Sequence, residues 1–302
     1  MPTFSPKNST RYGIRSISLP ARSHPSTVRT EEELNKLRSW EASSSSKVET
    51  ICAGLSGLVD LYKCIEDLLK LPLTQQALAQ HQDEKWVDEL LDCSVRFLDV
   101  LGNTRDAILL LKGNVGELQS GVRRRKIGDS GIENHVSAYL SLRKVVRKEC
   151  TKSMLLLKQT EASFDASPPL DLNDHVSAVV RVLREASLVT SSVFQSLLQF
   201  LSSPLLKSKL SKWAFVSRLV QKGVLVRNNQ QESVNELEKV DFALNTLVMN
   251  DSSKDVEVEK IQSAERRLQG LVGGIEGIEN ELECLFRHLI NTRVSFLNIF
   301  SP

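Results

Sequence analysis

The chain has 302 residues, with 39 Lys and Arg against 37 Asp and Glu, and its content of apolar residues is 41% against 5% aromatic. This length and apolar content suffice for a buried core, and the scarcity of aromatic residues favours Leu-packed helices over a sandwich or barrel of strands. The net charge of +2 excludes a global field that would draw the chain to nucleic acid or an acidic substrate. We therefore expect an all-α fold, a multi-helix bundle with long antiparallel helices.

The cysteines indicate a reducing, intracellular compartment. They are odd in number, scattered, and never form a Cys-x-x-Cys pair, so neither a disulfide framework nor a zinc site is indicated. Most of them fall among apolar helical positions, where we expect the thiol to serve as a small hydrophobe. The cysteines are Cys52, Cys64, Cys93, Cys150 and Cys284. No secretory signal is evident, and the apolar stretch Ala186 to Leu201 is too short to span a membrane. The cytoplasm is the expected location, with a membrane periphery, chloroplast or mitochondrion as alternatives.

Residues 1–29 are predicted to form a disordered basic arm, because they are rich in Ser and Pro and contain five cations and no acid. A composition of this kind also suits an organelle transit peptide, and it would attract an anionic membrane surface. Arg15 lies three residues before Ser18, a spacing that basophilic kinases accept. Ser18 is therefore a candidate phosphorylation site.

Order is expected to begin at Thr30, where Thr30 and Glu33 have the spacing of a capping box. Residues 30–302 then form a single helical-bundle domain, with a sub-boundary near 165–170 left open. A short helix through Leu34, Leu37 and Trp40 is expected to stop at the serine run 43–46. Helical periodicity follows from residue 51 to Pro72, and again over 86–122 with a fault near Gly102. These two segments are predicted to pair as a helical hairpin.

The second half of the chain shows the same periodicity. A loop at 128–131 precedes a helix over 132–157, which ends before the break at 167–169. Further helices are predicted over 176–200, ended or kinked by Pro204, over 205–222 and over 237–248.

The last helix has the strongest pattern, an apolar residue at alternating spacings of three and four, typical of a coiled-coil seam. The seam consists of Leu268, Leu271, Ile275, Ile278, Leu282, Leu285 and Leu289. Four glycines, at 270, 273, 274 and 277, lie in its middle and require close packing on neighbours to hold the helix. We favour a seam inside one bundle over a dimer zipper, and the oligomeric state stays open.

No pattern indicates an active site, a metal or a cofactor. The five histidines lack ligand spacing, and no phosphate-binding or nucleophile motif occurs. One compact basic cluster comprises Arg123, Arg124, Arg125 and Lys126. It is interpreted as a solvated helix end that suits the helix dipole, with phosphate contact or nuclear import as the alternative. Because aromatic residues do not interleave it, nucleic acid is not an expected partner.

Four strings resemble a plant-specific family of proteins of unknown function related to the BYPASS proteins. They are residues 15–27 (RSISLPARSHPST), 31–37 (EEELNKL), 55–62 (LSGLVDLY) and 180–185 (VRVLRE), and the likeness extends to the C-terminus. The resemblance implies an all-helical plant protein linked to root and shoot development. It implies no enzymatic activity and carries over no functional residues.

The sequence thus predicts a non-enzymatic helical regulator or adaptor, whose arm and C-terminal helices contact protein partners or an anionic membrane surface. Alternatives are a peripheral membrane-associated protein, a nucleic-acid-binding protein, an organelle-targeted protein, or an enzyme with a site assembled from distant residues.

Overall fold

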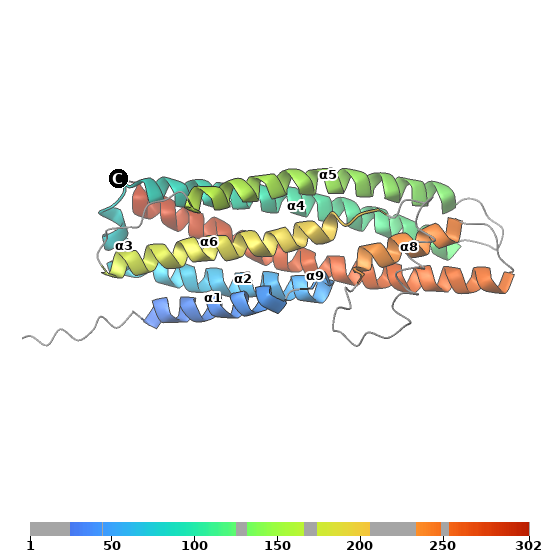
Figure 1. The fold of residues 1–302 in the computed structure, drawn as a ribbon, viewed down its shortest axis with the longest axis horizontal. Coiled ribbons are helices and arrows are strands. Elements are labelled where there is room, and N and C mark those ends of the chain that lie inside the picture. The colour runs from blue at the N-terminus through green and yellow to red at the C-terminus, as the bar shows by residue number, and fades with distance from the viewer. Residues whose placement is uncertain are drawn as a thin grey trace, which may run out of the picture.

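The computed structural model describes residues 25–43, 45–124, 132–165, 174–205, 234–248 and 254–301. These residues form eight helices and no strand, labelled α1 to α6, α8 and α9 (Figure 1). The predicted all-α fold class is therefore confirmed. In chain order the helices are α1 (Pro25–Ser43), α2 (Val48–Leu69), α3 (Pro72–Ala79), α4 (Lys85–Arg124), α5 (Ile132–Asp165), α6 (Asp174–Leu201), α8 (Glu236–Val248) and α9 (Lys254–Phe300).

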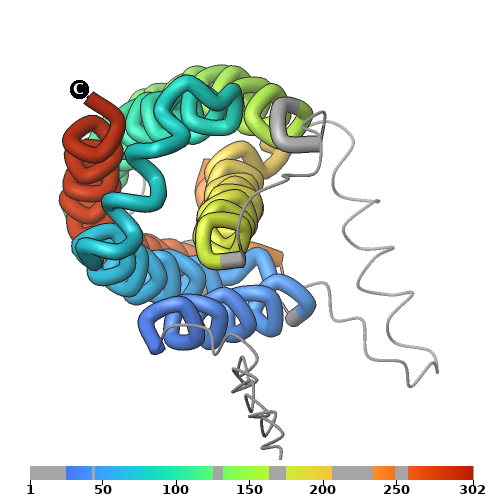
Figure 2. Tube along the Cα trace, turned by 90° about the vertical axis from the view of Figure 1, so that its left-hand side faces the viewer, coloured from blue at the N-terminus to red at the C-terminus, as the bar shows by residue number. Residues whose placement is uncertain are grey.

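The long helices run side by side along one axis, with α9 packed between α2 and α4 (Figures 1 and 2). Helix α4 also packs on α5, α5 on α6, and α1 on both α2 and α6. The predicted hairpin of α2 with α4 is therefore wrong, because α9 occupies the position between them. Helix α2 and helix α4 each pack on α9 instead of on each other.

Helix α1 begins at Pro25, earlier than the predicted start at Thr30. Proline suits the first turn of a helix, since its fixed φ is already helical and its missing N–H needs no partner there. Thr30 is completely buried inside the helix and its hydroxyl donates to the carbonyl of Ser26 at 2.8 Å. The predicted capping box is therefore wrong, and Glu33 pairs instead with Lys36. Arg29, assigned to the arm, lies on this helix.

Helix α1 lies close against α2 at two glycines. A Cβ atom on Gly54 would lie 2.5 Å from the Trp40 ring, and one on Gly57 would lie 2.7 Å from the Leu37 side chain. The Trp40 indole also donates to the carbonyl of Thr50 at 2.7 Å. These contacts fix the position of α1 on the bundle.

One more expectation needs correction. Helix α4 continues through Gly102 without the predicted fault, since a helix tolerates an isolated glycine at a modest cost. Pro72 lies in the first turn of α3, so it starts a helix as well as ending the preceding run. The predicted loop at 128–131 and the predicted helix at 206–222 lie outside the described residues.

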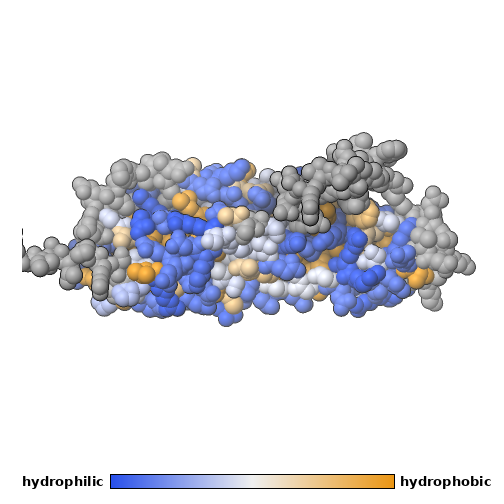
Figure 3. Space-filling view, turned by 60° about the horizontal axis from the view of Figure 1, so that its bottom comes forward, coloured by the Kyte–Doolittle hydropathy of each residue, from blue (hydrophilic) through white to orange (hydrophobic). Residues whose placement is uncertain are grey.

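One cluster of buried apolar side chains includes residues from all eight helices. It contains Leu157 and Val176, so one core extends to both sides of the candidate sub-boundary near 165–170. The surface seen in Figure 3 is largely hydrophilic, with separate apolar patches. Among the described residues, no helix combines the length and apolar character needed to cross a membrane.

Candidate functional site

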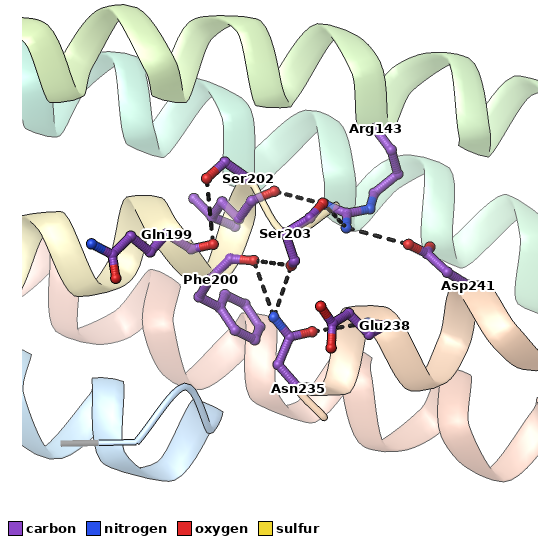
Figure 4. A network of polar contacts seen from close by, with 9 residues as sticks. Arg143, Gln199, Phe200, Ser202, Ser203, Asn235, Glu238 and Asp241 are labelled. Atoms are coloured by element: carbon purple, nitrogen blue, oxygen red, sulfur yellow. Dashed lines mark hydrogen bonds and ion pairs between the residues drawn. The ribbon is translucent and has the colours of Figure 1, made fainter. Parts of the chain in front are cut away.

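The most distinctive polar group in the described bundle is a buried ion pair between α5 and α8 (Figure 4). The Arg143 guanidinium lies 3.4 Å from the Asp241 carboxylate, and both side chains are 0% exposed. Burying each charge costs several kcal/mol unless a partner and further hydrogen bonds compensate. The pair therefore depends on the groups that surround it.

Arg143 also binds the end of α6. Its Nη1 donates to the carbonyl of Leu201 at 2.6 Å, and its Nη2 donates to that of Ser203 at 3.3 Å. Carbonyls in the last turn of a helix lack partners within the helix, and the negative end of the helix dipole favours a cation. Arg143 therefore acts as a C-terminal cap supplied by another helix.

Asn235 connects the same network to the start of α8. Its Nδ2 donates to the Ser203 hydroxyl at 2.7 Å, while its Oδ1 accepts from the backbone N–H of Glu238 at 2.8 Å. The second bond is that of an N-cap residue. We call the group of Tyr139, Arg143, Ser203, Asn235 and Asp241 the α6–α8 junction, because it holds the end of one helix beside the start of the next.

The electrostatics of the junction follow from its burial. Removal from water raises the pKa of Asp241, and the charge of Arg143 opposes this rise. Burial raises the pKa of Tyr139 well above its usual value, and the negative charge of Asp241 adds to the effect. The phenol therefore stays neutral. The junction contains a buried ion pair and donates hydrogen bonds to the backbone carbonyls of Leu201 and Ser203. These contacts fix the positions of α5, α6 and α8 relative to one another.

The predicted basic cluster is only partly within the described residues. Arg123 binds Glu265 of α9 through its Nε at 3.1 Å, so its charge is paired across two helices. Arg124 is the exposed last residue of α4. Arg125 and Lys126, like the candidate phosphorylation site Ser18, lie outside the described residues.

The predicted seam lies inside the bundle. All seven residues, Leu268, Leu271, Ile275, Ile278, Leu282, Leu285 and Leu289, are at most 2% exposed within a single chain. Polar contacts flank the seam on the α4 side, where Lys112 binds Glu279 at 2.6 Å and Arg105 binds Glu283.

The glycines of the seam region fall into two pairs. A Cβ on Gly274 would lie 2.8 Å from Val48, and one on Gly277 would lie 3.3 Å from the Cys52 sulfur. Nothing lies within 4 Å of the corresponding positions on Gly270 and Gly273. The close packing expected from the sequence thus holds at two of the four glycines.

A small cavity lies between α2, α4, α6 and α9. Its volume is about 20 Å³, enough for about one water molecule, and its lining includes Tyr62, Cys93, Phe97 and Thr292. Burial raises the pKa of Cys93 to about 12, so this thiol stays protonated and is a poor nucleophile. Among the described residues, no group of three or more His, Cys, Asp or Glu side chains could hold a metal ion.

The junction is not among the sites predicted from the sequence, although two signals could have indicated it. Arg143 shares the three- and four-residue spacing of Tyr139, Val146 and Cys150, which places a charge on an apolar helix face. Asn235 and Glu238 have capping-box spacing at the start of the helix predicted from 237.

Comparison with known proteins assigns the chain to a family. The family model described as Protein BPS1 matches residues 54–299. No significant match to a curated protein or to a solved structure was found. The match covers most of α2, all of α3 to α8, and α9 except its last residue, so it includes the whole junction and the seam, whereas α1 precedes it. On this evidence the chain belongs to the BPS1 family of BYPASS-related plant proteins.

Proposed function

We propose that this protein is a non-enzymatic helical regulator or adaptor that acts in plant root and shoot development by contacting protein partners in the cytoplasm. Family membership supports the developmental part of the proposal. The adaptor part is supported above all by the use of the buried charges at the α6–α8 junction. Arg143 and Asp241 are directed at helix ends and at each other, which fixes the relative positions of three helices.

A fixed arrangement of this kind suits recognition by helix faces. Helices α4 and α9 have 40 and 47 residues, so at a rise of about 1.5 Å per residue they extend about 60 and 70 Å. A partner can recognise the spacing of side chains along such a face only if neighbouring helices keep their positions relative to one another. The junction supplies this constraint at the end of α6 and the start of α8.

The proposal is tested in plants that lack the protein, with rescue of root and shoot growth as the readout. The wild-type chain should restore growth and co-purify with a reproducible set of proteins. Arg143→Met, which disturbs the junction without changing the exposed surface, should lose both. Arg266→Met, an exposed arginine on α9, is the matched control and should keep both.

Two results would contradict the proposal. Rescue by a chain that co-purifies with no protein, even after chemical cross-linking, would remove the adaptor role. Normal growth of plants that lack the protein and its relatives would remove the developmental role.

A further inference from the structure

Helix α5 is the only described helix on which cations outnumber acids. Over its whole length it has six Lys or Arg and four acids, and between residues 134 and 160 the single acid is Glu149. Helix α4, its neighbour, has six cations and six acids. Since Arg143 points into the junction, five of the cations of α5 remain to face solvent. They are Lys144, Arg147, Lys148, Lys152 and Lys158.

These five side chains form one outward face, which we call the α5 basic face. Lys144, Lys148 and Lys152 recur every four residues and so lie along one line of the helix. Glu149 binds Lys152 at 2.9 Å, and no acid of the described residues forms an ion pair with the other four. Like charges at this spacing repel one another by a few tenths of a kcal/mol per pair, so an anionic ligand would relieve the repulsion.

Exposed apolar side chains accompany the cations. Val145 is 51% exposed and Leu155 is 56% exposed on the same helix. Leu110 of α4, also 56% exposed, lies level with Val145, because Gly121 of α4 meets His135 of α5 and the two helices are antiparallel. Figures 1 and 2 place α5 on the side of the bundle opposite α1, where no described helix covers it.

This combination fits a lipid surface better than other polyanions. Lysine is a flexible point charge whose stem can lie along apolar groups while the ammonium reaches a phosphate. Base readout in a DNA groove favours arginine forks, and binding of single strands uses aromatic stacking. Exposed valine and leucine beside lysine match the boundary between headgroups and acyl chains. The face also extends along one helix at the surface of the bundle, which suits an extended ligand.

We propose that the α5 basic face docks the protein on an anionic membrane, with the lysines on lipid phosphates and carboxylates and with Val145 and Leu155 in the headgroup region. This goes beyond the proposed adaptor role, because it assigns a second kind of partner to one defined face. It also differs from the attraction expected of the N-terminal residues, because it assigns binding to α5, and α1 lies on the opposite side of the bundle from α5.

The test is co-sedimentation of the full chain with vesicles of phosphatidylcholine alone or mixed with phosphatidylserine. The triple variant Lys144→Gln, Arg147→Gln, Lys148→Gln is compared with the control triple Lys36→Gln, Lys47→Gln, Lys70→Gln, which removes the same charge from exposed sites on α1 and beside α2. Each basic residue near an anionic surface contributes about 1 kcal/mol, so the first triple should weaken partitioning about 100-fold. The control should behave like wild type, and thermal melting should show that both triples are folded.

A further variant, Leu155→Ser, should weaken binding by a smaller factor that persists at high salt, because its contribution is apolar. Three outcomes would overturn the proposal. The first is a wild-type protein that fails to bind phosphatidylserine vesicles, and the second is an equal loss of vesicle binding in the two triple variants. The third is a deletion of residues 1–24 that abolishes vesicle binding while the α5 triple variant binds like wild type. Binding of duplex DNA by a wild type that does not bind vesicles would assign the face to nucleic acid instead.

Discussion

The seam of α9 and the α6–α8 junction are both buried, yet they hold the bundle in different ways. The seam contributes apolar area, a stabilisation without direction, so similar side chains of equal volume can replace one another with small losses. The junction depends on atoms in fixed positions, because each buried donor or acceptor that loses its partner costs free energy. The bundle should therefore tolerate apolar substitutions of similar volume in the seam better than any loss of a polar group in the junction.

The largest expected effect is a charge placed in the seam. Leu282 is completely buried, so Leu282→Asp should lower the free energy of unfolding by more than about 4 kcal/mol, the range of the most severe point mutations. Thermal or urea unfolding measures this loss. Leu297 lies on the same helix but is 41% exposed, so Leu297→Asp is the control and should stay within about 0.5 kcal/mol of wild type.

Light scattering on the same proteins shows whether the seam lies within one chain or between two chains. Because the seam is buried inside one chain, wild type should not need a partner copy to bury it, and its mass should be that of a monomer. A wild-type dimer that becomes a folded monomer on Leu282→Asp would instead show a seam between chains.

The next effect concerns the junction. Arg143→Met keeps most of the side-chain volume but leaves the Asp241 carboxylate and the carbonyls of Leu201 and Ser203 without their donor. Breaking one side of a buried pair costs about 3–5 kcal/mol. Arg147, one turn later, is exposed, so Arg147→Met should be nearly neutral in the same urea titration. Equal stability of the two variants would mean that the pair is not held as described.

A third experiment uses adjacent glycines of α9. Gly273→Ala should stabilise the protein by up to about 1 kcal/mol, because alanine favours helix and nothing lies within 4 Å of its Cβ. Gly274→Ala should destabilise it by about 1–3 kcal/mol, because the new methyl group would lie 2.8 Å from Val48. Melting temperatures that move in the same direction would contradict the close contact of α9 with α2.

The smallest effect is a pH dependence. The pKa of Asp241 is raised above 3.8 in the folded protein, so the folded state keeps this proton to a higher pH than the unfolded state does. Its contribution to stability is complete below the unfolded pKa and is lost as pH rises through the folded pKa. The stability of wild type minus that of Asp241→Asn should therefore decline from acid to neutral pH. Urea unfolding at a series of pH values measures the difference, and a rising difference would contradict the assigned direction.

The parts of the fold that could be predicted are those that depend on periodicity. The residues of the seam and most helix interiors follow from apolar spacing, which is local information. The pairing of α2 with α4 was predicted wrongly because sequence order suggests adjacent partners, and only the distant α9 shows what separates them. The start of α1 was missed because Thr30 fits a cap as well as a buried helical position.

The junction could not be predicted for a related reason. A single arginine on an apolar face signals burial, but its partners come from residues 201–203 and 241, far along the chain. The acid that completes the pair, Asp241, resembles any other acid of a helical face in the sequence. Only the packing of α5 against α8 distinguishes it.

The bond between Asn235 and Ser203 has a consequence for how the chain can vary in length. Since Asn235 Nδ2 lies 2.7 Å from Ser203 Oγ, the end of α6 and the start of α8 are held next to each other. The entropy of closing a connection between two fixed points grows only with the logarithm of its length, and each doubling costs about 0.6 kcal/mol. The bundle can therefore accept a longer or shorter connection between α6 and α8, including a whole inserted domain, with little loss of stability. Insertions and deletions should accumulate there, and a fluorescent reporter placed between residues 206 and 233 should leave the rest of the protein intact.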